Sequence, residues 1–196
     1  MPLNRLISKQ TGFAIAGVLA LTACAQFGVT VTRVDHAYQY DPFQVSTAGG
    51  GDRQLKVEVL GNPFEASQDE LERTVISSMQ GRTFGVPVNF SAAPTNRDPN
   101  RNFHVVVAFN PEGVRDPGQL CTASSDLKSV ATTGGTLTLM GALCSSDIYL
   151  SHAIARAGGI DGVNSDTLDS LVAQLTISLF PDENPNRQTD GEVPTN

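Results

Sequence analysis

The sequence predicts an α+β fold, a two-layer sandwich in which a small mixed sheet carries two amphipathic helices on one side, with one disulfide. Two segments carry apolar residues at helical spacing, residues 67–81 and 166–179. Between them, Phe103–Phe109 is apolar on both faces, which is typical of a central strand covered on two sides. The order of strand, helix, strands and helix favours helices packed on one side of a mixed sheet.

Length and composition fit one globular domain. The chain has 196 residues, 40% of them hydrophobic, a formal net charge of −7 and a pI near 4.8. Because an acidic surface repels phosphate backbones, we expect no nucleic-acid partner. Three cysteines are too few for a disulfide-dense scaffold and form no paired-CxxC zinc site, so we expect neither a metal nor a cofactor.

The first two dozen residues have the layout of a secretory signal. Arg5 and Lys9 precede an uncharged run, Thr11–Leu21. That run is too short for a membrane-spanning helix, which needs about 20 apolar residues. The signal finishes on small residues in the sequence Leu21-Thr22-Ala23-Cys24.

This ending resembles the lipobox of bacterial lipoproteins, the motif at which they are cleaved and lipidated. The resemblance implies that Cys24 takes a diacylglyceryl thioether, and that its amine is freed by cleavage and then acylated, for example with palmitate. Two or three acyl chains give a stable membrane anchor. In a two-membrane bacterium, Ala25 in place of Asp implies the outer membrane, facing the periplasm. An ordinary signal peptide with a chance cysteine, or a buried apolar segment, is the alternative.

We therefore divide the chain into a signal peptide (1–23), a lipidated N-terminus and tether (24–53), the α+β domain (54–181) and a disordered polar tail (182–196). Cleavage would leave 173 residues with a formal charge of −9, since Arg5 and Lys9 are lost. The tether includes one edge strand near Phe27–Val34 and the glycine run Gly49–Gly51.

The elements of the domain follow from local patterns. Leu55–Leu60 alternates as a half-buried strand does. Ser67 and Glu70 form a capping box for the first helix, which stops at Gly81. The remaining segments are an edge strand at Val86–Phe90, the central strand, a strand at Thr136–Leu143, an ambiguous strand or helix at Ile148–Ala157, and a helix at Asp166–Leu179.

Cys121 and Cys144 are the thiols that remain once Cys24 is lipidated, and we expect them to form a structural disulfide. The loop between them spans 23 residue steps, for which chain entropy gives roughly 3 kcal/mol. A redox-active or metal-binding pair is the alternative, but the spacing is not CxxC and no histidine lies within four residues of either cysteine.

The histidines indicate no zinc site. We expect His104 to be a hydrogen-bonded core residue and His36 to be solvated in the tether, while His152 has no HExxH or HxH context. His152 with Ser145–Asp147 contains the residue types of a hydrolase triad, but the GxSxG pattern is absent. Asp161–Asp166 holds oxygen ligands at alternating positions but lacks the twelve-residue calcium pattern, so we expect a turn leading into a helix cap, with calcium as the alternative.

Residues 25–196 carry no motif of a characterised family, so the expected function follows from the N-terminus. We expect a lipid-anchored envelope protein with a non-catalytic interaction or assembly role and an envelope protein partner, not an enzyme. A periplasmic module that binds a small ligand is the alternative, and an envelope hydrolase with unrecognised carboxylates is a third. The loops at 91–102 and 111–120 are the first places to look for a functional surface.

Overall fold

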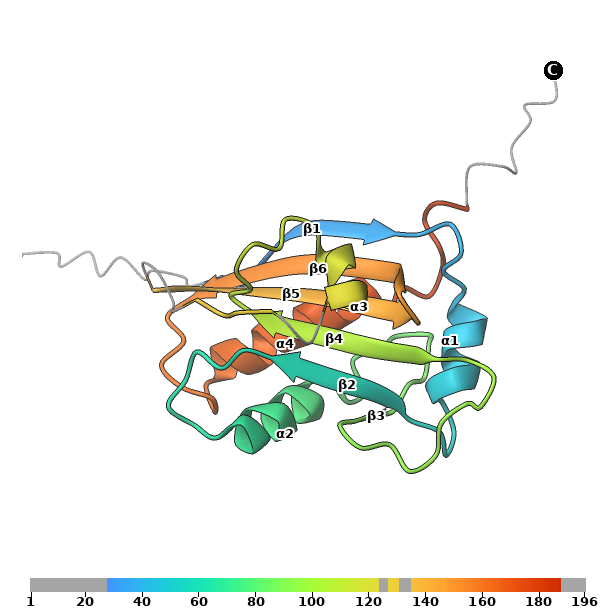
Figure 1. Ribbon diagram of the computed structural model, residues 1–196, viewed down its shortest axis with the longest axis horizontal. Coiled ribbons are helices and arrows are strands. Elements are labelled where there is room, and N and C mark those ends of the chain that lie inside the picture. Colours follow the sequence, from blue (N-terminus) through green and yellow to red (C-terminus); the bar gives the residue numbers. More distant parts are fainter. Residues whose placement is uncertain (1–27, 124–126, 131–134, 188–196) are drawn as a thin grey trace, which may run out of the picture.

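A computed structural model describes residues 28–123, 127–130 and 135–187. Its centre is a six-stranded mixed sheet in the order β1-β6-β5-β4-β2-β3 (Figure 1). The strands β2, β3 and β4 run parallel, whereas β4, β5, β6 and β1 pair antiparallel. The strands are β1 (Thr30–His36), β2 (Leu55–Leu60), β3 (Phe90–Ser91), β4 (Phe103–Phe109), β5 (Thr136–Ser145) and β6 (Ile148–Gly158).

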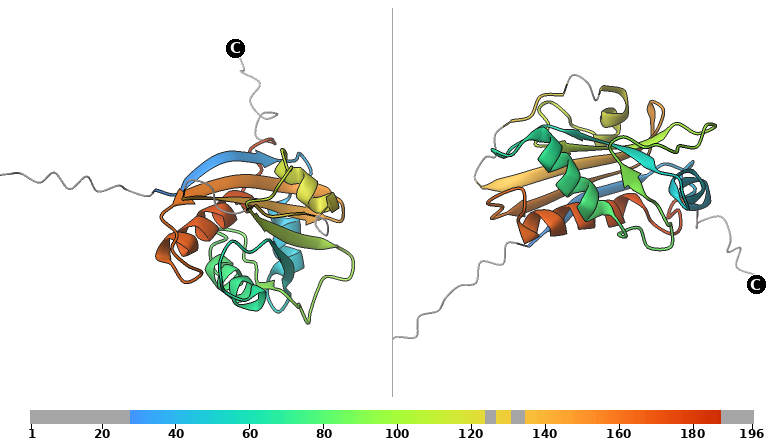
Figure 2. Two further views of the ribbon diagram at one scale, coloured as in Figure 1. Left: turned by 60° about the vertical axis from the view of Figure 1, so that its left-hand side comes forward. Right: turned by 90° about the horizontal axis from the view of Figure 1, so that it is seen from below.

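Two amphipathic helices, α2 (Gln68–Met79) and α4 (Asp166–Leu179), cover one face of the sheet (Figure 2). The hydroxyl of Ser67 accepts from the Glu70 amide at the start of α2, as the capping motif predicts. Gly81 follows the helix end at a φ of +70°, a conformation that favours glycine. The α+β class, the mixed sheet and the disulfide are therefore confirmed.

The other face carries the short η1 (Pro117–Gln119) and α3 (Leu120–Ala123). A second apolar cluster lies there, distinct from the main core beneath α2 and α4. Alternate residues of β4 serve the two clusters, Val105 and Val107 on the helix side and Val106 and Ala108 on the other. The interpretation of β4 as a strand covered on two sides is confirmed.

The stretch expected to form a tether, residues 24–53, supplies two elements of the domain. The edge strand is present as β1, but α1 (Pro42–Gly49) follows it, and Val45 and Ala48 pack in the main core. Asp41 caps α1 by accepting from the amides of Phe43 and Gln44, and Pro42 occupies the first turn. The Asp-Pro pair therefore starts a helix instead of marking a linker.

Residues 182–187 also differ from the expectation of a disordered tail, because they are tied to the segment after β1. The Nδ2 atom of Asn184 donates to the carbonyls of Ala37, Tyr38 and Tyr40 at 3.0, 3.2 and 2.9 Å. The remainder of the predicted tail, 188–196, lies outside the described residues.

Two strands differ from their sequence patterns. The ambiguous segment at 148–157 is β6, which lies between β1 and β5 in the sheet. Of the strand expected at Val86–Phe90, only Phe90 belongs to β3, and Val86 and Val88 are buried outside the strand. No helix in the described part of the chain is long and apolar enough to cross a membrane.

Candidate functional site

The lipidation candidate Cys24 lies outside the described residues, but the place where the chain enters the domain is defined. Gly28 is the first described residue, and β1 begins at Thr30, six residue steps after Cys24. Any anchor on Cys24 is therefore joined directly to the edge strand.

The second candidate, the disulfide between Cys121 and Cys144, is present. The two Cα atoms are 5.6 Å apart. Cys144 lies on β5 with no exposed surface, and Cys121 on α3 is 7% exposed. The bond attaches the turn-rich segment of η1 and α3 to the sheet face opposite α2 and α4.

A polar cluster that sequence reasoning missed surrounds His152 on β6. The imidazole has no exposed surface, and neither of its ring nitrogens makes a hydrogen bond. Its Nε2 atom lies 3.3 Å from Oδ1 of Asp116, at the start of η1, and 3.6 Å from Oδ2 of Asp35 on β1. The register that sets Asp35 opposite His152 brings β1 into the cluster.

Burial and the neighbouring carboxylates have opposite effects on the pKa of His152. Burial lowers the pKa of His152, while the carboxylates of Asp116 and Asp35 act to raise it. Asp116 accepts from the Gly118 amide at 2.9 Å and lies 3.4 Å from the guanidinium of Arg33. The Gly118 hydrogen bond is the largest cause of the lowered pKa of Asp116. The cluster therefore holds a neutral imidazole beside two anions and one cation.

The neighbours of His152 do not support a hydrolase triad, the arrangement against which the absent GxSxG pattern also argued. Its acidic neighbours are Asp35 and Asp116, whereas Ser145–Asp147 lie at the turn between β5 and β6. The hydroxyl of Ser165 accepts from the Leu168 amide and caps α4. Residues 161–166 therefore lead into a helix cap, as expected. Within 28–123, 127–130 and 135–187, no three acidic, histidine or cysteine side chains are arranged to hold a metal ion.

The burial of the other two histidines differs from expectation, since His36 is buried and not solvated, and His104 is less buried than a core residue. His36 is 9% exposed, and its Nε2 atom lies 3.1 Å from the Ser178 carbonyl of α4. Burial, the largest cause, lowers its pKa. His104 is only partly buried on β4, with Nδ1 3.4 Å from the Asn102 carbonyl. His36 is buried because β1 belongs to the sheet.

Of the two loops expected to carry function, 91–102 has a structural explanation. Asp98 is 7% exposed and forms ion pairs with Arg101 at 2.9 Å and Arg53 at 3.6 Å. The Asn100 amide and the Arg101 side chain lower its pKa. The other loop, 111–120, contributes Asp116 to the His152 cluster.

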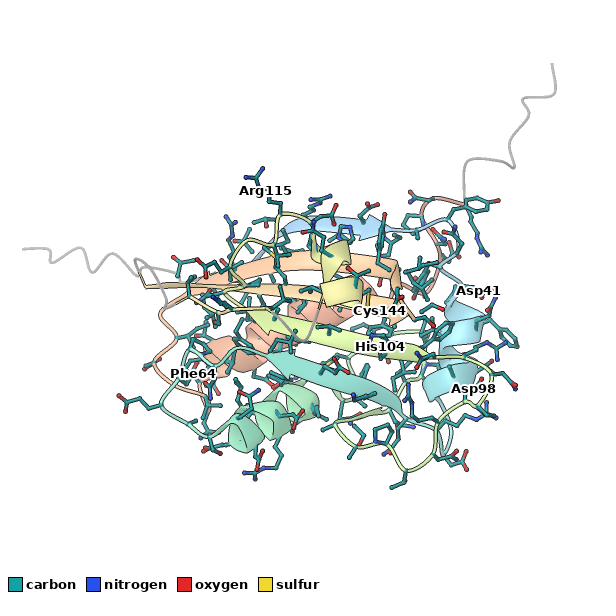
Figure 3. All side chains as sticks on the ribbon, viewed as in Figure 1. Asp41, Phe64, Asp98, His104, Arg115 and Cys144 are labelled. Atoms are coloured by element: carbon teal, nitrogen blue, oxygen red, sulfur yellow. A yellow bond between two sulfur atoms is a disulfide. The ribbon has the colours of Figure 1, made fainter. Side chains whose placement is uncertain are left out.

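An open groove of about 1380 Å³ lies at the end of the domain where the chain enters. Gly28 lines it, together with the β2–α2 loop and the β6–α4 loop. Figure 3 places Phe64 at this end and Asp41 at the other.

Exposed aromatic side chains lie at the other end. Phe43 on α1 is 77% exposed and Tyr38 is 61% exposed. The Arg187 guanidinium stacks over the Tyr38 ring at 5.4 Å and lies 3.9 Å from Asp41, which caps α1. These contacts connect the β1–α1 turn to the C-terminal segment.

No family model and no curated protein matches the chain. Two solved structures of PelC from Paraburkholderia phytofirmans are similar in arrangement. One, a dodecamer of a leucine-to-methionine variant, is 15% identical, with a TM-score of 0.39 over 80% of this chain and 100% of that one. The other dodecamer is 14% identical, with a TM-score of 0.37 over 78% and 97%. Likeness at this level says nothing about function.

Proposed function

We propose that the chain is an exported lipoprotein, anchored through Cys24 to the outer membrane, whose domain acts in the periplasm as a non-catalytic interaction module. The buried disulfide between Cys121 and Cys144 carries this proposal. Such bonds persist in oxidising compartments and are rare in the cytosol, so the disulfide supports export independently of the N-terminal motif.

The interaction role rests on what the domain leaves exposed. His152, whose two ring nitrogens have no hydrogen-bond partner, has no exposed surface, so a substrate could not contact it in this conformation. Phe43 and Tyr38, in contrast, present large apolar surfaces to solvent. Exposed apolar surface on a soluble domain commonly marks a protein-binding site.

The edge strand β1 is the less suitable surface for a partner. It carries an irregularity between Val31 and Arg33, and Arg33 and Asp35 place charges along it. Bulges and charges are features that protect edge strands from pairing with other chains. We therefore place the partner contact at the α1 end.

Membrane fractionation and mass spectrometry test the anchor. The native protein should fractionate with membranes and carry a lipid-modified N-terminal cysteine, whereas Cys24→Ala should be soluble. A native protein that is soluble and unmodified would overturn the lipoprotein proposal.

Photo-crosslinking in cells tests the interaction surface. A photoreactive residue at Phe43 or Tyr38 should give one defined envelope product, while the same residue at Thr32 on β1 should give none. Capture from Thr32 alone would place the partner on the edge strand and contradict the assignment.

The groove favours a second candidate, a module that binds a small ligand, because it is an open depression beside two loops. A ligand retained through native purification, and lost on filling the groove with Gly162→Trp, would support that function.

A further inference from the structure

The main core closes completely at one end of the domain and incompletely at the other. At the α1 end, Tyr40, Phe90 and Phe180 are at most 2% exposed. At the end where the chain enters, Val163 is buried, but several other apolar side chains that pack on the core stay partly exposed. They are Val29, Val31, Phe64, Ala66 and Ile160.

The three segments that carry these side chains lie together at this end of the domain (Figure 1). Phe64, Ala66 and Ile160 line the groove, and Val29 follows Gly28, which also lines it. Val29 directly precedes β1, Phe64 lies in the β2–α2 loop, and Ile160 lies in the β6–α4 loop. The ring of Phe64 packs edge-on against Phe109, with centroids 6.2 Å apart. Phe64 is therefore held in place at the rim of the core.

The length of chain before the domain determines which end lies next to an anchor on Cys24. Four residue steps separate Cys24 from Gly28, and a fully extended chain covers about 14 Å over that length. The eleven residues of β6 span about 36 Å from one end of the sheet to the other. The link is much shorter than the domain, so the groove end stays close to the anchoring membrane.

We propose that the groove end rests on the phospholipid surface, with Val29, Phe64 and Ile160 at the headgroup level. This inference rests on the proposed lipidation of Cys24. Partly covered apolar side chains gain free energy by leaving water for the headgroup and acyl boundary, where amphipathic surfaces bury to a depth of roughly 5–10 Å.

The charges at this end select the lipid. Glu65 and Asp161 are exposed and line the groove, and no lysine or arginine is among the described residues that line it. Carboxylates attract the ammonium group of phosphatidylethanolamine and are repelled by anionic headgroups. The surface therefore suits a zwitterionic leaflet rich in ethanolamine lipids.

Depth-dependent quenching in vesicles tests this orientation. The lipidated mature protein is reconstituted in phosphatidylethanolamine and phosphatidylcholine with nitroxide-labelled lipid, and a thiol fluorophore is attached to one introduced cysteine. The sulfur of Cys24 is held in the thioether of the lipid anchor, and Cys121 and Cys144 are bonded, so only the introduced thiol reacts. The exposed positions Asn164, Gln44 and Thr32 report the groove end, the α1 end and the β1 edge.

We expect quenching at Asn164→Cys to be several times that at Gln44→Cys and Thr32→Cys. Strong quenching at Thr32 would show that the domain lies on its edge strand, and equal or absent quenching at Asn164 and Gln44 would show no preferred contact. Either result overturns the inference while leaving the anchor intact. A protein that fails to sediment with the vesicles contradicts the anchor itself.

The charge dependence supplies a second readout. Adding anionic phosphatidylglycerol should reduce quenching at Asn164→Cys, and Glu65→Lys with Asp161→Lys should reverse that reduction. Both carboxylates are exposed, so their replacement leaves the fold intact. If quenching at Asn164→Cys changes neither with the lipid charge nor with these substitutions, the assignment of this end to the headgroups is overturned.

Discussion

The Nε2 atom of His152 lies 3.3 Å from Oδ1 of Asp116, yet the imidazole is wholly buried and neither of its nitrogens is hydrogen-bonded. Burial is the largest influence on His152 and lowers its pKa from 6.5, in spite of the nearby carboxylates of Asp116 and Asp35. At neutral pH the folded protein therefore holds an uncharged imidazole that water cannot reach.

The first prediction is that the domain loses stability in mild acid through His152. Because its folded pKa is depressed, the unfolded chain takes up the proton first, so the free energy of unfolding falls as pH drops below about 6.5. The loss is at most about 1.4 kcal/mol per pH unit for one group. Urea unfolding at pH 7.5 and 5.5 measures it, and His152→Phe, which still packs on Tyr149, should reduce the difference.

His36 contributes in the same direction, because burial lowers its pKa too, so His152→Phe should remove only part of the acid sensitivity. His104→Gln, at a partly buried position, is the matched control. If stability falls equally steeply in His152→Phe and in the native protein, the buried imidazole is not the acid-sensitive group.

The second prediction concerns the disulfide. Replacing both cysteines, Cys121→Ala with Cys144→Ala, should cost about 3 kcal/mol, because the unfolded chain regains the freedom of the loop between them. For a domain of this size the melting temperature should fall by roughly 6–12 °C. Calorimetry of the oxidised native protein and the double variant measures this. If the reduced native protein has the same melting temperature as the oxidised protein, the bond adds no stability.

The third prediction concerns Asn184, which is 6% exposed and donates to three carbonyls after β1. Asn184→Asp keeps the size of the side chain but replaces its donating amide with a carboxylate, which would be repelled by those carbonyl oxygens. We expect a loss of about 1–3 kcal/mol, measured by urea unfolding. Asn164→Asp, at an exposed position, is the control and should change little. Equal effects at both positions would contradict a structural role for the 182–187 segment.

Elements with a regular apolar period could be predicted from the sequence. Leu168, Leu171 and Leu175 form one helical stripe and Ser165 caps it, so α4 was predicted with its observed bounds. β6 was ambiguous because Ser151 and His152 occupy buried positions in it. Ser151 is accommodated by a hydrogen bond to the Leu179 carbonyl at 2.6 Å, a contact that depends on the packing of α4.

The candidate site was less predictable, because it joins residues that are distant in the chain. Asp35, Asp116 and His152 meet only through the β1–β6 register and the placement of η1, and neither follows from local pattern. The disulfide was predictable because only two thiols remain in the expected mature chain. Asn184 was missed because a polar residue that bonds to backbone carbonyls has no periodic signature.

The last prediction tests the close approach of α4 to the sheet at Gly141 on β5. A Cβ atom added there would lie 3.0 Å from methyl carbons of both Leu175 and Leu179. Gly141→Val should therefore cost about 1–3 kcal/mol by overpacking, and Leu175→Ala combined with it should cost less than the sum of the two. Gly162→Ala, with open space around the added carbon, is the control. Strict additivity in a double-mutant cycle of urea unfolding would show that the helix does not constrain this position.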